Sequence, residues 1–251
     1  MLWQGDQHEG HGGNRSFLHE LPARMEMHQE SKQLSTPINM HSTSMYVEAA
    51  YNESADDIKA LFEGLEPGDK RKLLMMQADD KSTPLHCAAA VSKGADVIRV
   101  LCEGLELRDK LELLMMEDKY KSTPLHKGAA NSNSADVIKA LCEGLEPGEK
   151  LELLMVEDDE NSTPLHKGAA NSNNADVIVA LFEGLESGEK LELLMMEDKY
   201  KSTPLHDGIA YSNSADVIRA LFEGLEPGDK LKLLMRENDG KETPLHKGAA
   251  N

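Results

Sequence analysis

The forty residues from Ser122 to Asn161 read STPLHKGAANSNSADVIKALCEGLEPGEKLELLMVEDDEN, and they decide the fold because the chain repeats them. The next forty residues, 162–201, are identical to this stretch at all but eight positions. The opening motif returns at every fortieth residue, as Ser82–His86, Ser122–His126, Ser162–His166, Ser202–His206 and, in variant form, Glu242–His246. A period of this length with so much self-similarity indicates a stacked array of repeats, in which each unit buries its apolar face against its neighbours.

The first part of each unit predicts a helix, here named helix A, that begins after Thr123. The Thr123 hydroxyl can cap the helix, and Pro124 suits the first helical position because no backbone donor is needed there. Helix A is expected to run to about Asn131. Asn133 then stands where the chain must reverse, and asparagine tolerates the left-handed conformation better than most residues.

Two further helices are expected in the remainder of the unit. Helix B should span about 135–143, because its apolar residues follow helical spacing. Gly144 is a natural C-terminal stop for it. Pro147 then starts a short helix C that includes the apolar run 151–155. Three helical pieces per unit and little strand make the predicted fold class all-α.

The composition divides the chain near residue 42. Residues 1–41 are rich in His, Gly, Gln and Ser, and we expect a mobile tail with a short helix near Leu21–Gln33. The array should occupy 42–251 as about five repeats, with units that begin at 42, 82, 122, 162 and 202 and a partial unit at 242. The first unit is degenerate, as terminal units commonly are, because one of their faces meets water.

Charge and composition narrow the classes of partner. The 251-residue chain carries a net charge of −18, which disfavours phosphate backbones and anionic lipids and favours neutral or basic protein surfaces. No apolar run approaches the ~20 residues that cross a bilayer, and no secretory signal is visible. Three cysteines without CxxC spacing indicate reduced thiols in a cytosol-like compartment. We therefore expect a cytoplasmic protein that binds no nucleic acid and inserts into no membrane.

The repeat resembles the ankyrin repeat family, whose pattern is Thr-Pro-Leu-His-x-Ala-Ala, then a turn and a pair of valines. Thr123–His126 match directly. Ala129 and Ala130 match if Gly128 is an inserted residue, and Val137 with the isoleucine after it stands for the paired valines. The resemblance covers about residues 42–251. It implies a helical solenoid that acts as a non-catalytic protein-binding scaffold or adaptor, without cofactor or metal.

Two departures from the family pattern bear on the shape of the array. Each unit has forty residues, whereas the ankyrin repeat has ~33, and most of the extra residues fall in helix C. The family's loop glycine, two residues before the Thr, is here Lys81, Lys121, Asn161, Lys201 or Lys241. Because the family's β-hairpin finger needs a residue that tolerates positive φ, we predict that helix C replaces or displaces the finger.

The histidine that recurs once per unit is interpreted as structural: His86, His126, His166, His206 and His246. Zinc needs ligands within ~2.1 Å of one ion, whereas stacked helices are ~8–10 Å apart. In the family this histidine makes hydrogen bonds around the first turn of helix A. Cys102 and Cys142 share a repeat position with Phe182 and Phe222, which predicts a buried apolar slot instead of a reactive thiol.

Positions that vary between otherwise nearly identical units are the candidates for partner binding. They form rows along helix A and at the loop tips, where exposed tyrosine suits protein recognition. The candidate residues are Tyr120, Lys127, Asn131, Lys167, Asn171, Tyr200, Asp207 and Tyr211. Sequence drift on an idle surface is the other interpretation, and the sequence does not choose between the two.

The function expected from the sequence is that of a scaffold or adaptor, whose partner lies on the concave face or the loop edge of the solenoid. A host-directed effector, delivered into a host cytosol, is a narrower hypothesis that rests on family analogy alone. An alternative from a different class is a regulatory or targeting segment of a larger enzyme, truncated at Asn251. A third hypothesis is self-association through an uncapped C-terminal repeat.

Overall fold

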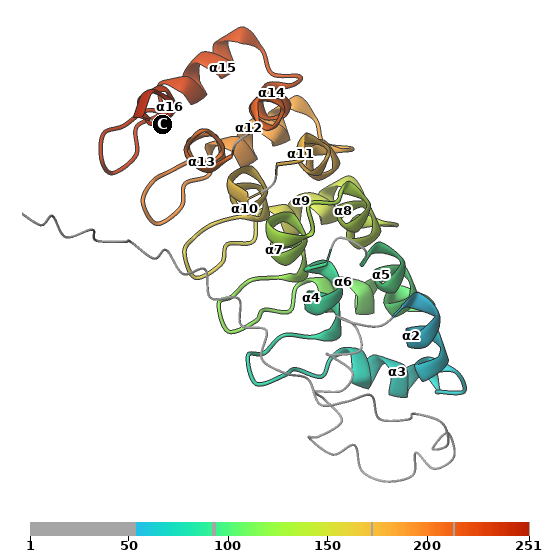
Figure 1. The fold of residues 1–251 in the computed structure, drawn as a ribbon. Helices are drawn as coiled ribbons and strands as arrows, with labels where there is room; N and C mark the ends of the chain where they lie inside the picture. Colours follow the sequence, from blue (N-terminus) through green and yellow to red (C-terminus); the bar gives the residue numbers. More distant parts are fainter. Residues whose placement is uncertain (1–53, 92–93, 172, 213, 251) are drawn as a thin grey trace, which may run out of the picture. The chain divides into compact units, whose positions relative to one another are not determined.

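The computed structural model describes residues 54–91, 94–171, 173–212 and 214–250. Within these ranges every regular element is a helix (Figure 1). None of the described helices is long and apolar enough to cross a membrane. The expected tail over residues 1–41, its short helix and the start of the first unit lie outside the described residues.

Equivalent helices of successive units stack in three rows (Figure 1). The helix A row contains α4 (Pro84–Ala89), α7 (Pro124–Lys127) with η1 (Gly128–Ser132), α10 (Pro164–Asn171), α13 (Pro204–Tyr211) and α16 (Pro244–Ala250). The helix B row contains α2 (Ala55–Phe62), α5 (Ala95–Cys102), α8 (Ala135–Cys142), α11 (Ala175–Phe182) and α14 (Ala215–Phe222). The helix C row contains α3 (Pro67–Leu74), α6 (Leu107–Leu114), α9 (Pro147–Leu154), α12 (Ser187–Met195) and α15 (Pro227–Leu234). Neighbours within a row pack together, as α5 does on α8 and α10 on α13. The all-α, ankyrin-like solenoid with an extra helix per unit is confirmed.

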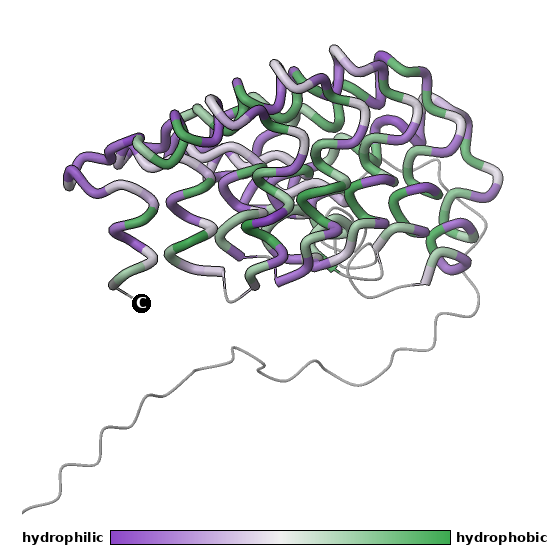
Figure 2. Tube along the Cα trace, turned by 90° about the horizontal axis from the view of Figure 1, so that it is seen from above, coloured by the Kyte–Doolittle hydropathy of each residue, from purple (hydrophilic) through white to green (hydrophobic). Residues whose placement is uncertain are grey.

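The core lies between the three rows. In the unit that begins at 122, Leu125 of α7, Ile138 and Leu141 of α8, and Leu153 and Leu154 of α9 are fully buried. Figure 2 shows such apolar positions recurring along the trace from unit to unit. Burial of a leucine or isoleucine side chain contributes about 1.5–3 kcal/mol relative to its exposure. Because each unit shares this core with its neighbours, its stability depends on them.

Helix A begins as the sequence predicts. The Thr123 hydroxyl accepts a hydrogen bond from the His126 N–H at 3.5 Å, and the helix starts at the following proline. The inserted residue is accommodated by a wider turn, because α7 continues at Gly128 as the π-helix η1. A Cβ at Gly128 would lie 3.1 Å from Leu141 Cδ1, so glycine permits the close packing on α8 without a shift of that leucine. The chain then reverses at Asn133, which has the expected left-handed conformation with a φ of 48°.

The loop after helix C keeps a tight turn, and this corrects one prediction. Lys121 adopts a φ of 57°, and the equivalent residues of the other units are left-handed too. The Asp118 carbonyl accepts a hydrogen bond from the Lys121 N–H at 3.0 Å, and the Asp118 N–H donates to the Ser122 carbonyl at 3.0 Å. The unit therefore contains both helix C and a tight loop turn with a positive φ, so helix C does not replace the turn. A left-handed lysine costs ~1–2 kcal/mol, which these hydrogen bonds offset.

Helix C also links adjacent units through a buried lysine. The Nζ of Lys150 in α9 donates hydrogen bonds to the carbonyls of Ala180, at 2.9 Å, and Glu183, at the C-terminus of α11 in the next unit. Lys70 and Lys110 make the equivalent contacts with the ends of α5 and α8. Carbonyls at a helix C-terminus lack partners within the helix, and a positive charge there is favourable. The added helix therefore strengthens the attachment of one unit to the next.

Candidate functional site

The loop tips form one edge of the array, and an aspartate fixes each of them in the central units. Asp118 Oδ1 accepts hydrogen bonds from the N–H groups of Tyr120, at 2.8 Å, and Ser122, at 2.9 Å. Asp158 holds Glu160 and Ser162 in the same way, at 2.9 and 3.0 Å. The tip residues are thus presented at fixed positions on a hydrogen-bonded turn.

Adjacent loop tips are also joined to one another. The Asp159 N–H donates a hydrogen bond to the Tyr120 carbonyl at 3.0 Å. Equivalent bonds of 2.8, 2.9 and 2.9 Å join Lys119 to Asp80, Lys199 to Glu160 and Asp239 to Tyr200. One backbone hydrogen bond per step makes the loop tips a continuous, preformed edge.

The repeated histidines support this edge from beneath. The Nδ1 of His126 accepts the N–H of Thr123 at 3.2 Å, so its Nε2 carries the proton and donates to the Ser162 carbonyl at 2.9 Å. His86, His166 and His206 repeat the arrangement with the first residue of the next unit. Burial lowers the pKa of His126 and of His166 to about 4, so both are neutral at neutral pH. The hydrogen bonds predicted around helix A are confirmed, and they extend to the next unit.

Two of the candidate lysines are engaged with the loop aspartates. The Nζ of Lys127 lies 2.6 Å from Asp118 Oδ2, and that of Lys167 lies 2.7 Å from Asp158 Oδ2. Both aspartates are buried. Burial alone would raise the pKa of Asp118, but the hydrogen bonds from Lys127 and from two backbone N–H groups outweigh it, and the pKa is lowered. Each of these lysines therefore anchors its helix A to the loop tip that precedes that helix in the chain.

Asp207 interrupts this pattern in the unit that begins at 202. It occupies the position of Lys127 and Lys167, so it meets Asp198 of its own loop where a cation would be expected. Burial, and then the charge of Asp198, raise the pKa of Asp207 to about 7, while Lys167 and Lys247 act in the opposite direction. Asp207 is therefore partly protonated at neutral pH.

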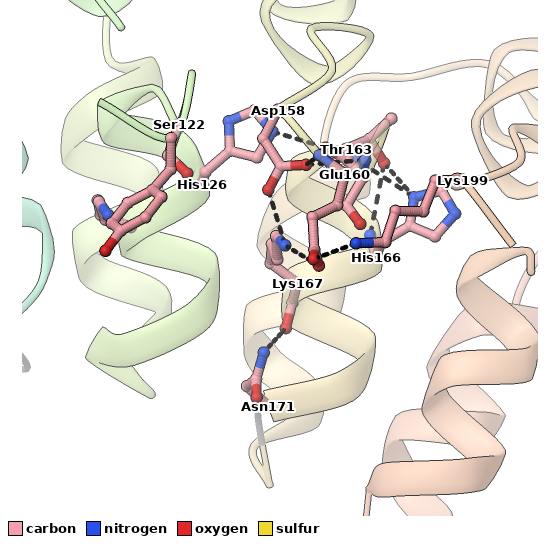
Figure 3. A network of polar contacts seen from close by, with 12 residues as sticks. Ser122, His126, Asp158, Glu160, Thr163, His166, Lys167, Asn171 and Lys199 are labelled. Atoms are coloured by element: carbon pink, nitrogen blue, oxygen red, sulfur yellow. Dashed lines mark hydrogen bonds and ion pairs between the residues drawn. The ribbon is translucent and has the colours of Figure 1, made fainter. Parts of the chain in front are cut away.

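An open groove of about 390 Å³ lies between the loop tips and helix A of the units at 122 and 162. It is lined by four of the candidates: Tyr120, Lys127, Asn131 and Lys167. Asp159 and Glu160 add acidic groups to its lining. Figure 3 shows the polar network beside it, in which Lys167 bonds Asp158 and Glu160 accepts the Nζ of Lys199 at 2.6 Å. The groove is thus acidic, aromatic at its rim and held by ion pairs.

The remaining candidates lie on the same two rows, further along the array. Asn171 closes α10, where its Nδ2 donates to the Lys167 carbonyl at 3.1 Å. Tyr200 occupies a loop tip and Tyr211 the end of α13. The three tyrosine side chains are among the most exposed large residues described, with 51% of Tyr120, 58% of Tyr200 and 67% of Tyr211 accessible.

Reasoning from the sequence missed the partners of Lys127 and Lys167. Each pairing spans nine positions, from Asp118 to Lys127 and from Asp158 to Lys167. A comparison of the units at 82, 122 and 162 carries part of the signal. Where the loop aspartate is replaced by Ala78, the helix A position holds the neutral Cys87 instead of a lysine. Burial raises the pKa of each half-buried cysteine thiol, to about 11 for Cys87, which lowers the fraction of thiolate at neutral pH.

Comparison with known proteins agrees with this architecture. Residues 46–151 match the family model for ankyrin repeats, in three copies. No curated protein matches the chain. Ankyrin repeats are typical of protein–protein interaction modules. Beyond residue 151, the repeat keeps the same forty-residue period and the same three helices in the described part of the chain. Residues 46–151 therefore belong to ankyrin repeats, and the same forty-residue unit recurs beyond them.

Proposed function

We propose that the array is a scaffold or adaptor that binds a protein partner across the loop tips and helix A between residues 118 and 211. The observation that carries the proposal is the set of exposed tyrosines, Tyr120 and Tyr200 at loop tips and Tyr211 at the end of α13, of which Tyr120 lines a preformed groove. Large exposed aromatic side chains on a rigid surface are typical of binding hot spots. The hydrogen-bonded edge supports a low entropic cost of binding, because the surface is ordered before the partner arrives.

The charge of the surface favours a neutral or basic partner segment. Asp159 and Glu160 line the groove, and the whole chain carries a charge of −18. Lys119 and Lys199 lie over the rings of Tyr120 and Tyr200, each 4.9 Å from the ring centroid. These contacts hold the rings in place, and the acidic groups beside them attract a basic segment and accelerate its association.

The test is affinity capture from a cell lysate with the full chain and with a variant that carries Tyr120→Ala, Tyr200→Ala and Tyr211→Ala. Lys127 and Lys167 are left unchanged, because loss of either would leave a buried aspartate unpaired. A matched control carries Leu107→Ala, Val179→Ala and Met115→Ala, three exposed apolar residues outside this surface. We expect a protein that the native chain and the control capture and the tyrosine variant loses. Equal capture by all three chains would contradict the proposed surface.

A further inference from the structure

The space between the loop aspartate and helix A holds a lysine ammonium in two units of the array. Lys167 Nζ lies 2.7 Å from Asp158 Oδ2, and the unit at 122 has the equivalent pair at 2.6 Å. In the unit at 202 the loop aspartate is kept as Asp198, but Asp207 takes the lysine position. The aspartate pair, Asp198 and Asp207, thus meets where the two preceding units place a carboxylate and a cation.

Asp198 is held in the same way as the aspartates of those units. Its Oδ1 accepts hydrogen bonds from the N–H groups of Tyr200 and Ser202, each at 2.8 Å. Its Oδ2 therefore corresponds to the oxygen of Asp158 that pairs with lysine. Asp158 is buried, whereas Asp198 is half-buried. Because aspartate is shorter than lysine, the Asp207 side chain covers the loop aspartate less completely and leaves room for an ammonium between the two carboxylates.

The lysines of the surrounding loops and helices are engaged with other acids. Those pairs are Lys167 with Asp158, Lys199 with Glu160, Lys201 with Asp239 and Lys247 with Glu242, at 2.7, 2.6, 3.2 and 2.8 Å. Within the described ranges, no ion pair joins a lysine or arginine to Asp198 or Asp207. The aspartate pair therefore keeps its capacity to receive a cation from another molecule.

The same unit also differs one helical turn further along α13. Tyr211 stands there, at the position of Asn131 and Asn171 in the two preceding units. Residues four apart share one face of a helix, so Tyr211 lies on the face of Asp207. The tyrosine is 67% exposed. The face of an aromatic ring attracts cations, so both changes in this unit favour a positively charged ligand.

We propose that the aspartate pair binds a lysine side chain of the protein partner, whose ammonium takes the place that the Lys167 ammonium has in the preceding unit. The proposal rests on the proposed function, because it names the chemistry that one part of the binding surface recognises. The ammonium lies between Asp198 Oδ2 and the Asp207 carboxylate. Charge-assisted hydrogen bonds to a carboxylate are stronger than neutral ones, so this lysine anchors the partner.

The ionisation of Asp207 sets the pH range of this contact. Its pKa is raised to about 7, first by burial and then by the charge of Asp198. The other charged groups that act on it are Lys167 of α10, Lys247 of α16 and Glu160 of a loop tip. The ionised fraction of a group with this pKa falls about tenfold from pH 8 to pH 6. The affinity for an ammonium should fall by a similar factor.

The test is a titration of the full chain with butylammonium, which is the lysine side chain as a free amine, followed by NMR of the aspartate carboxyl carbons. We expect the signals of Asp198 and Asp207 to shift and to saturate at pH 8, with an affinity about tenfold lower at pH 6. The signal of Asp158, which is already paired with Lys167, should stay unchanged. Butanol is the neutral control probe and should cause no shift.

Two substitutions at Asp207 separate the contact from unspecific attraction. Asp207→Lys supplies the ammonium from the chain itself, as Lys167 does in its unit, and Asp207→Asn removes the charge at similar size. Both variants should lose the saturating shift at Asp198. Asp136→Asn removes an exposed carboxylate of α8 and is the matched control, which should bind butylammonium like the native chain. Circular dichroism of each variant establishes that the array is folded.

Four results would overturn the proposal. The first is a native chain in which butylammonium shifts neither Asp198 nor Asp207, and the second is an equal shift at Asp158. The third is a shift at Asp198 that persists in Asp207→Lys. The fourth is stronger binding of butylguanidinium, the arginine side chain as a free cation, since it would assign the contact to arginine.

Affinity capture distinguishes a failure of this proposal from a failure of the proposed function. A partner that the tyrosine variant loses and Asp207→Lys captures like the native chain would overturn the lysine contact and leave the tyrosine surface intact. Saturation by butylammonium, together with equal capture by the native chain and the tyrosine variant, would support the aspartate pair as a lysine site and contradict the tyrosine surface.

Discussion

The Nζ of Lys167 lies 2.7 Å from Oδ2 of the buried Asp158, nine residues earlier in the chain. This contact joins the first turns of helix A to the loop tip that precedes it, and Lys127 makes the same contact with Asp118. The two elements that line the groove are therefore held together by a charge pair that is largely screened from water. The unit at 202 has exchanged the cation for Asp207, and this substitution within the array provides an internal comparison.

Removal of the Lys167 cation should destabilise the array. Lys167→Met keeps most of the apolar stem but leaves Asp158 with only its two backbone donors. We expect a loss of about 1–3 kcal/mol in the free energy of unfolding, measured by urea denaturation, because a buried charge without its partner is costly. Lys139→Met, on the exposed side of α8, is the control and should change stability little. Equal effects of the two substitutions would contradict the role of the ion pair.

The Asp207 carboxyl should make stability depend on pH. Its pKa of about 7 lies above the ~3.9 of an unfolded aspartate, so the folded state retains a proton that the unfolded state loses. Its contribution to the free energy of unfolding therefore falls as pH rises from about 4 to 7. Asp207→Asn removes the titration. We expect the variant to equal the native chain near pH 4 and to exceed its stability by ~2 kcal/mol at pH 8, a value reduced because water reaches part of the side chain.

Urea denaturation of both chains across this pH range checks the prediction. Asp207→Lys should also stabilise the array at pH 8, because it restores the pairing seen at Lys167. If the stability difference between the native chain and the Asp207→Asn variant does not change with pH, the Asp207 carboxyl does not titrate in this window.

The buried histidines should make the array sensitive to acid. The pKa of His126 in the folded chain is about 4, below the ~6.5 of an unfolded histidine. The contribution of His126 to the free energy of unfolding is therefore fully present above pH 6.5 and is lost as pH falls toward 4. The loss is on the order of 3 kcal/mol. In His126→Gln that titration is absent. The stability gap between the native chain and this variant should narrow as pH falls from 6.5 to 4.5, and a gap that stays constant would contradict the prediction.

The lysine of helix C should couple adjacent units. Lys150→Met removes the donor to the Ala180 and Glu183 carbonyls while keeping the stem. We expect a loss of about 1–2 kcal/mol and a broader urea transition, because coupling between neighbouring units makes a repeat array unfold cooperatively. An unchanged transition would show that the contact does not link the units.

The left-handed lysines offer a stabilising substitution. Lys121 has a φ of 57°, a conformation that costs a side chain ~1–2 kcal/mol, whereas glycine adopts it freely. Glycine also loses ~0.5–1 kcal/mol through the entropy of the unfolded chain. Lys121→Gly should therefore raise the free energy of unfolding, measured by urea denaturation, by about 0.5–1 kcal/mol. Lys119→Gly, two residues earlier and without a positive φ, should lower it by a similar amount. A loss of stability at Lys121 would contradict the strain argument.

The three helices of each unit could be predicted because each has local signals. Thr and Pro start helix A, Asn133 ends it, and Gly144 separates helix B from helix C. The loop turn could not be predicted from Lys121, whose intrinsic preference is against positive φ. There the hydrogen bonds that the Asp118 carboxylate accepts, the furthest from the Ser122 N–H four residues away, override that preference.

The features that remained hidden depend on stacking. Lys150 lies among glutamates in sequence and resembles a solvent-exposed residue, and only the neighbouring unit supplies the carbonyls that bury it. The candidate residues can be found from the sequence because they vary between units. The groove that four of these residues line depends on how two units are spaced, which the sequence does not show. Only the contacts with Asp118 and Asp158 show that Lys127 and Lys167 support the fold.

The most direct test of the proposed binding surface is amide hydrogen exchange of the full chain with and without the captured partner. The account predicts that the partner slows exchange at the loop tips, residues 118–121, 158–161 and 198–201, and leaves α8 and α11 of the helix B row unchanged. Protection confined to the helix B row, or to helix C, would place the partner elsewhere and contradict the account.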